Sequence, residues 1–261
     1  MKKFIAMLLA VVMICALCAC NNNTTNPTTN PVTEPKFDAS AKDEGTMTYA
    51  QYAAADLDTA VVVECFVQAT QGWWEKEGQG VITVYAQDPD GAYFMYEMKC
   101  SKDDAAKLVP GTKIKVTGYK AEYKGEVEII DCTFEIMEGK WVAAPTDVTA
   151  KLASEDLIKY QNMFIAIKGA KIVASKDANG AEHAFLYNWD GSGQAGNDLY
   201  FNIEVDGKVY NMCVESYLTG DGSPVYDMVE TLAIGDVVDL EGFLYWYNGV
   251  NPHITSCKKA G

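Results

Sequence analysis

The stretch Gly111-Thr-Lys-Ile-Lys-Val-Thr-Gly-Tyr-Lys-Ala-Glu-Tyr-Lys-Gly125 occurs twice in this chain. A shift along the sequence lays it, without a gap, on Gly235-Asp-Val-Val-Asp-Leu-Glu-Gly-Phe-Leu-Tyr-Trp-Tyr-Asn-Gly249. Each copy predicts a strand that follows a turn glycine, bends at a second glycine and enters an aromatic hairpin closed by a third. We therefore expect one structural unit to be present twice.

The elements expected around each copy have the order of an OB-fold. The first half predicts strands over residues 61–67, 81–85 and 93–98, a helix over 101–109, and strands over 113–119 and 126–136. The second half predicts strands over residues 163–173, 201–205 and 208–214, a helix over 226–232, and strands over 237–243 and up to Cys257. Three strands, a helix and two strands form a five-stranded Greek-key barrel. The predicted fold is mainly β: two tandem OB-type barrels with short helices, over residues 46–140 and 146–261.

The amino terminus predicts export. Two lysines, an apolar run over residues 4–17 and small residues before Cys20 are typical of a signal peptide, and the run is too short to remain as a spanning helix. Leu17, Ala19 and Cys20 resemble the lipobox of bacterial lipoproteins, which implies cleavage before Cys20 and a lipid on its sulfur. Residues 1–19 would be the lipoprotein signal peptide, and residues 20–45 the lipidated Cys20 with a flexible Asn/Thr/Pro linker. Cys18 as the modified residue and an ordinary secretory signal are the alternatives.

The charge of the chain argues against polyanions. The formal net charge is -15, and all 21 basic residues are lysines. Nucleic-acid binding draws affinity from cations at phosphates, and arginine is the usual reader of phosphate and guanine. We therefore expect nucleic acid to be a disfavoured partner, and the acidic surface to keep the protein soluble.

No catalytic motif stands out. The two histidines, His183 and His253, lie alone, and no metal-site or phosphate-loop pattern occurs. The acidic turns at residues 88–91 and 190–198 could offer oxygens to calcium, but they do not match EF-hand spacing and are explained as ordinary turns. We expect a protein that is not an enzyme and has no cofactor and no metal.

Five cysteines follow the leader region and Cys20. Cys100 and Cys213 lie near the end of each third strand, and Cys132 and Cys257 lie in each fifth strand. These strands are neighbours in an OB barrel, so disulfides Cys100–Cys132 and Cys213–Cys257 are candidates in an exported protein. The alternative is that all are buried thiols, as expected for Cys65.

Aromatic residues give the best hint of a ligand. Trp73 and Trp74 lie between the first two strands, and Tyr245 and Trp246 lie in the hairpin between the last two. In OB-folds these loops flank the ligand face, and rings without basic residues suit sugars or peptides. The alternative is that these side chains pack in the core or the hairpins.

The chain as a whole resembles surface lipoproteins of Gram-positive bacteria that carry two tandem OB-fold-like domains; the two glycine-framed segments and the lipobox carry the resemblance. It implies a protein anchored by lipid to the extracytoplasmic face of the cell membrane, and we expect a monomer. We expect a non-catalytic binding or adaptor module for glycan or protein. The alternatives are accessory OB domains for extracellular nucleic-acid processing, or a small hydrolase built on the loop at residues 190–198.

Overall fold

A computed structural model describes residues 37–260, and residues 37–261 form one compact unit. The predicted signal peptide, Cys20 and most of the linker lie outside the described residues. None of the helices within this range is long and apolar enough to cross a membrane.

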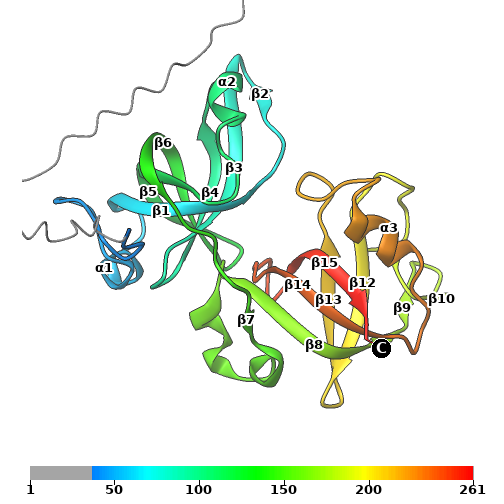
Figure 1. Ribbon diagram of the computed structural model, residues 1–261. Helices are drawn as coiled ribbons and strands as arrows, with labels where there is room; N and C mark the ends of the chain where they lie inside the picture. Colours follow the sequence, from blue (N-terminus) through cyan, green and yellow to red (C-terminus); the bar gives the residue numbers. More distant parts are fainter. Residues whose placement is uncertain (1–36, 261) are drawn as a thin grey trace, which may run out of the picture. The chain divides into compact units, whose positions relative to one another are not determined.

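The first barrel contains strands β1 to β6 (Figure 1). Strand β1 pairs with both β5 and β3, and the parallel pairing of β4 with β6 completes the circle β1-β3-β4-β6-β5. This is the OB order, because the first, second, third, fifth and fourth barrel strands follow one another around it. The elements are α1 (Tyr49–Ala54), β1 (Ala60–Thr70), β2 (Trp74–Lys76), β3 (Gln79–Gln87), β4 (Ala92–Lys99), α2 (Lys102–Ala105), β5 (Thr112–Tyr123) and β6 (Glu126–Lys140).

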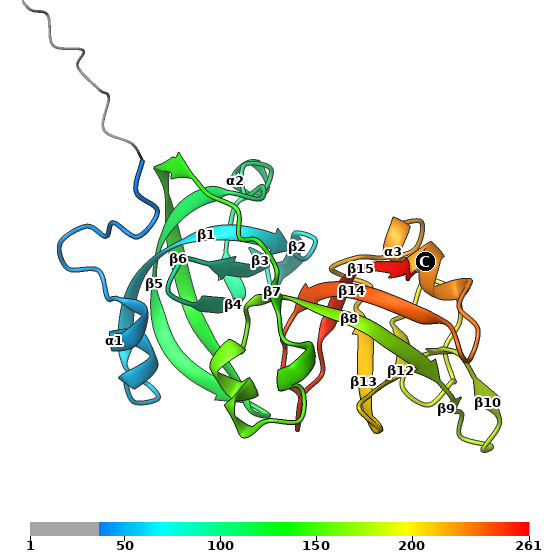
Figure 2. The same ribbon diagram turned by 60° about the horizontal axis from the view of Figure 1, so that its bottom comes forward.

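The second barrel repeats this circle as β8-β12-β13-β15-β14, again with one parallel pair, β13 with β15 (Figure 2). The predicted fold of two OB-type barrels is thus confirmed. The elements are β7 (Thr146–Asp147), the 3-10 helices η1 (Thr149–Lys151) and η2 (Glu155–Tyr160), β8 (Phe164–Val173), β9 (Ser175–Lys176), β10 (Glu182–His183), β11 (Leu186–Tyr187), β12 (Leu199–Val205), β13 (Lys208–Val214), α3 (Pro224–Glu230), β14 (Val237–Phe243) and β15 (His253–Lys259).

The repeated segment forms the same strand in both barrels. Its middle glycines, Gly118 in β5 and Gly242 in β14, lie at register shifts in the pairing with the neighbouring strand. A Cβ on Gly118 would meet the Cys132 side chain at 2.6 Å, and one on Gly242 would meet the His253 carbonyl at 2.2 Å. Glycine is required at both bends because the next strand passes where a side chain would be.

The tips of the two repeated hairpins touch each other. The backbone N–H of Asn248 donates to the Lys124 carbonyl at 2.7 Å, and the rings of Tyr123 and Tyr247 lie 6.2 Å apart. Each barrel has its own apolar core, and a third cluster of Tyr85, Phe94 and Phe243 joins them. The two barrels therefore share a packed junction.

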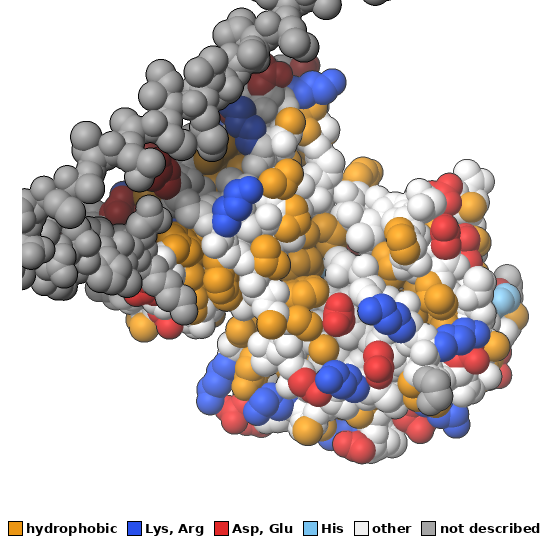
Figure 3. All heavy atoms as spheres, in the orientation of Figure 1, with side chains coloured by type: hydrophobic (Ala, Val, Ile, Leu, Met, Phe, Trp, Pro, Cys, Tyr) orange, Lys and Arg blue, Asp and Glu red, His pale blue; other side chains and the backbone are white. Residues whose placement is uncertain are grey.

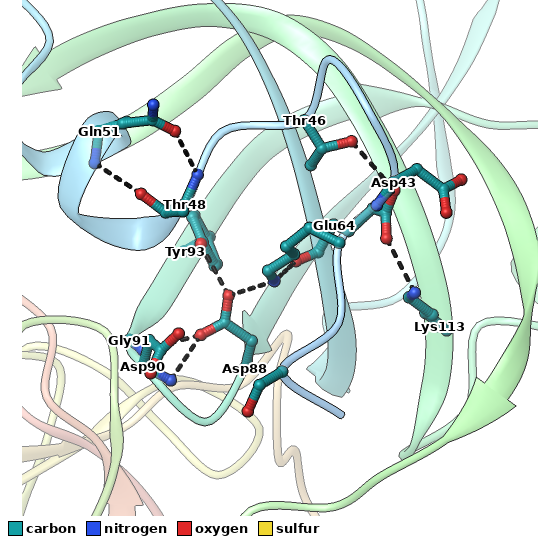
Figure 4. Close-up of polar contacts among 12 residues, drawn as sticks. Asp43, Thr46, Thr48, Gln51, Glu64, Asp88, Asp90, Gly91, Tyr93 and Lys113 are labelled. Atoms are coloured by element: carbon teal, nitrogen blue, oxygen red, sulfur yellow. Dashed lines mark hydrogen bonds and ion pairs between the residues drawn. The ribbon is translucent and has the colours of Figure 1, made fainter. Parts of the chain in front are cut away.

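The N-terminal segment, residues 37–48, is fastened to the first barrel by buried ionic contacts (Figure 4). Lys42 donates to Asp88 at 2.6 Å and to the Glu64 carbonyl, while the Glu64 carboxylate pairs with Lys113 at 2.8 Å and accepts from Thr46. Both carboxylates are fully buried. A buried carboxylate without a cation would destabilise the folded state, and in each pair the lysine compensates that charge.

One predicted helix is shorter than expected. Ser101 caps α2 by accepting from the Asp104 N–H, as its sequence indicates, but the α-helix ends at Ala105 rather than near residue 109. The backbone then turns through successive short-range bonds into β5, because Pro110-Gly111 cannot extend a helix.

Candidate functional site

A cleft of about 700 Å³ lies at the junction of the two barrels. Strand β4 and Gln71 of the first barrel lie on one side, and strands β12, β13 and β15 of the second barrel, with the loops before β12 and after β14, supply most of the other lining residues. Its lining is rich in aromatic and acidic side chains: Gln71, Phe94, Tyr96, Trp189, Asp198, Tyr200, Asn211, Cys213, Glu215, Tyr245, Tyr247, Asn251 and His253.

The cleft coincides with the face that OB-folds use for oligomeric ligands. Tyr200 and Asn211 lie on β12 and β13, the second and third strands of the second barrel. Trp189 lies in the long loop between its first and second strands, and Tyr245 lies in the loop between its fourth and fifth. The second and third strands and these two loops are the regions that bind oligonucleotides and oligosaccharides in OB-folds.

The aromatic rings are fixed at the floor of the cleft and free at its rim. Tyr245 stacks on His253 with ring centres 4.3 Å apart, and its other contact is edge-on with Phe94 at 5.4 Å. Trp189, in contrast, is 76% exposed, and Tyr96 is 44% exposed. A flat ligand could therefore stack on rim rings without first displacing packed side chains.

His253 is held as a neutral ring. Its Nδ1 lies 2.7 Å from the Tyr85 hydroxyl, which belongs to the first barrel. Burial lowers the pKa of His253 to about 4 and raises the pKa of Tyr85 well above its usual value. The hydrogen bond therefore joins a protonated tyrosine to a neutral imidazole, and the tautomer of His253 decides which of the two donates.

Two carboxyl groups line the same cleft. Asp198 accepts hydrogen bonds from the N–H and hydroxyl of Ser216 at 2.8 and 2.6 Å. Glu215 accepts from Gln71 of the first barrel at 3.0 Å and from the Tyr217 N–H. Burial, and then the nearby charge of Asp198, raise the pKa of Glu215 to about 7. The charge of Asp198 thus disfavours ionisation of Glu215.

The structure places only one of the four predicted aromatic residues in the cleft, namely Tyr245. The Trp73 indole donates to the Cys100 carbonyl at 2.9 Å and packs on the first core, and Trp246 packs on the second. Trp74 is 43% exposed, at the start of β2 and away from the cleft lining. The four residues therefore do not form one face.

Two of the cleft residues that were not predicted as ligand contacts come from the long loop before β12. Trp189 immediately precedes the glycine-rich run at residues 190–198, and Asp198 ends it. The signal was present, because the insertion is absent from the first copy and insertions in OB loops often carry function. Phe94 and Tyr96 had no such signal, since β4 becomes a wall only when the barrels pack together.

The candidate disulfides are not formed: all five cysteines of the described range are free and buried. Cys213 pairs with His253 in the β13–β15 ladder, so Cys257 lies four positions further along, at roughly 13 Å, beyond disulfide reach. Cys100 and Cys132 are two positions out of register, counted from the Met95–Ile129 pair. Burial raises the pKa of each thiol.

The acidic turns are stabilised by their own backbone. Asp88 accepts from the N–H groups of Asp90 and Gly91, and Asp190 accepts from the N–H of Ser192. His183 is exposed and lies 3.4 Å from Asp177. Within residues 37–260, no three His, Cys, Asp or Glu side chains gather as metal ligands would.

Comparisons with known proteins give structural neighbours but no family. No family model matches the chain, and no curated protein matches it. The chain is similar to a murine DNA-binding protein bound to double-stranded DNA (13% identity, 77% of this chain and 96% of that one, TM-score 0.37). It is also similar to the Ifi202 HINa domain in complex with double-stranded DNA (11% identity, 77% of this chain and 100% of that one, TM-score 0.35). A third neighbour is a replication protein A heterotrimer bound to single-stranded DNA (9% identity, 80% of this chain and 51% of that one, TM-score 0.32).

These neighbours contradict the expectation of a glycan or protein ligand with nucleic acid disfavoured. That interpretation is withdrawn. Net charge describes a whole surface, whereas OB-folds also hold nucleic acid by stacking its bases.

Proposed function

We propose that the chain is a non-catalytic protein that binds single-stranded nucleic acid through its bases, in the cleft between the barrels. The observation that carries the proposal is the set of rings over the second and third strands of the second barrel. Tyr200, Tyr245 and Tyr247 lie there together with the exposed indole of Trp189. Every base has a flat face, so such rings accept bases without requiring a particular sequence.

The charge of the site defines how binding would occur. None of the residues that line the cleft is a lysine, and its histidine is neutral. On the face of the molecule shown in Figure 3, lysines and acids are interspersed. Phosphate contacts would therefore contribute little, and affinity would come from stacking, at roughly 1–3 kcal/mol per base. Salt should weaken this binding less than it weakens binding by a basic groove.

Double-stranded ligands fit this cleft poorly. Bases in a duplex are already stacked and present only their edges in the grooves. A single strand can turn its bases towards the rings at no cost in base pairing. The export signal and the lipid on Cys20 belong to the same proposal, and they would present the cleft outside the cytoplasm.

The test is binding of the unit 37–261 to labelled oligonucleotides of about 12 nucleotides, a length within the span of one to three OB-folds. Fluorescence anisotropy would compare single strands with the corresponding duplex at low and high salt. We expect Trp189→Ala to weaken single-strand binding by roughly fivefold to 150-fold. Trp74→Ala is the matched control, because Trp74 is also exposed but lies outside the cleft.

Two results would reject the proposal. One is the absence of single-strand binding by the folded protein at the concentrations that detect the weakest stacking interactions. The other is equal loss of binding in the Trp189 and Trp74 variants, which would show that the strand is bound elsewhere.

A further inference from the structure

The cleft combines aromatic rings and carboxyl groups but contains no cation. Asp198 and Glu215 both line it, and neither takes part in a salt bridge with any residue of the range 37–260. Elsewhere in the molecule the buried carboxylates Glu64 and Asp88 are each paired with a lysine. Asp198 and Glu215, like the buried Glu126 and Glu128, thus lack the positive partner that Glu64 and Asp88 have.

The hydrogen bonds of Asp198 leave one of its oxygens free. Both donors of Ser216 bond to Oδ1, and no described residue donates to Oδ2. Asp198 is only partly buried and is a lining residue, so this oxygen is available to a ligand. The carboxylate is held in place by Ser216 and remains able to accept.

Aromatic rings next to such a carboxylate bind organic cations. The negative face of a tyrosine or tryptophan ring attracts an ammonium group within about 6 Å, and a nearby carboxylate adds a charge-assisted hydrogen bond. Trp189, Tyr200 and Tyr245 line the same cleft as Asp198. A cleft of about 700 Å³ has room for a chain of several methylene groups as well as the ammonium group.

We infer that the cleft binds a linear organic polyamine, with one ammonium group against Asp198 and the rings that line the same cleft. A second ammonium group on the same molecule is then free to meet a phosphate. The bound polyamine would supply the positive charge that the cleft lacks, so this inference adds to the proposed function. The cation site itself, however, does not require nucleic acid to be present.

The first experiment titrates spermidine into the unit 37–261 without nucleic acid and follows binding by calorimetry. We expect saturable binding that weakens by about tenfold or more in Asp198→Asn, which keeps the oxygen that accepts from Ser216 but removes the charge. Asp190→Asn is the matched control, since Asp190 caps the same loop but does not line the cleft. Glu215→Gln gives a second variant if Asp198→Asn fails to fold.

The second experiment repeats the oligonucleotide titration with and without spermidine. We expect spermidine to raise single-strand affinity about tenfold in the wild-type protein and not in Asp198→Asn, with magnesium chloride of equal ionic strength as the control for charge screening. Absence of spermidine binding to the protein alone, or equal binding to both proteins, would overturn the inference. Spermidine binding without any oligonucleotide binding would reject the proposed function and leave the cation site standing.

Discussion

Glu126 allows a sharp test of how the barrels are joined. Its side chain is fully buried, and its Oε2 accepts from the Trp246 N–H at 2.9 Å and from the Gln161 side chain at 3.2 Å, both from the second half of the chain. Its Oε1 has no partner among the described residues. Burial, supplemented by the nearby carboxyl of Glu128, raises the pKa of Glu126 to about 8. We predict that Glu126→Gln stabilises the protein at alkaline pH and changes little in acid.

The magnitude follows from the two pKa values. In the folded protein Glu126 keeps its proton up to about pH 8, whereas the ordinary pKa of a glutamate side chain, taken for the unfolded state, is 4.5. Below pH 4.5 Glu126 is protonated in both the folded and the unfolded state, so it does not change the free energy of unfolding. As the pH rises from the lower to the higher value, the folded state loses stability relative to the unfolded one. The full cost is about 5 kcal/mol, from about 3.5 pKa units at 1.36 kcal/mol each. Glutamine has no charge to lose.

Urea unfolding of the unit 37–261 near pH 4 and near pH 9 measures this difference, because the other titrating groups cancel between variant and wild type. We expect Glu126→Gln to raise the free energy of unfolding, relative to the wild-type protein, by on the order of 3–5 kcal/mol near pH 9 and to leave it unchanged near pH 4. Glu122→Gln, at an exposed site in β5, should show no such difference. A gain of equal size at both pH values, or a loss at the higher pH, would refute the reasoning.

Three further predictions concern folding. Lys42→Met should cost roughly 3–5 kcal/mol in denaturant unfolding because it leaves the Asp88 charge buried without a cation, whereas Lys159→Met in an exposed pair should cost far less. Equal costs would contradict this. Gly242→Ala should lower the unfolding free energy by roughly 2–3 kcal/mol, and Gly72→Ala, with open space around it, should be nearly neutral; a stable Gly242 variant would show that the strands can separate. A thiol reagent should label no cysteine of the native unit 37–261 and all five after denaturation, and rapid native labelling would show an exposed thiol.

The barrels could be predicted because their determinants are local. Gly118 and Gly242 mark the bend in the repeated strand, and each is required by the strand that passes next to it. Asp206-Gly207 marks the hairpin between β12 and β13, where both residues have positive φ. Such signals depend on a few neighbouring residues, so they can be recognised in a single sequence.

The cleft could not be predicted because it is made by contacts between distant parts of the chain. Tyr85 and His253, whose hydrogen bond lies beneath it, are separated by 168 residues. Trp73 lies in the expected loop, but its indole N–H donates to the Cys100 carbonyl of its own barrel. No local pattern tells whether an aromatic ring in a loop will pack on the core or line a ligand site, because the answer depends on what lies opposite.

The meeting of the two repeated hairpins has a consequence for stoichiometry. Where Asn248 bonds to Lys124, the barrels come together with β4 of the first placed against the strands of the second. The third strand of the first barrel is thereby used as a wall, and its rings serve the neighbour's cleft. Duplication of the unit has therefore not duplicated the site. A chain with two barrels should saturate with one equivalent of ligand, along a simple hyperbolic curve.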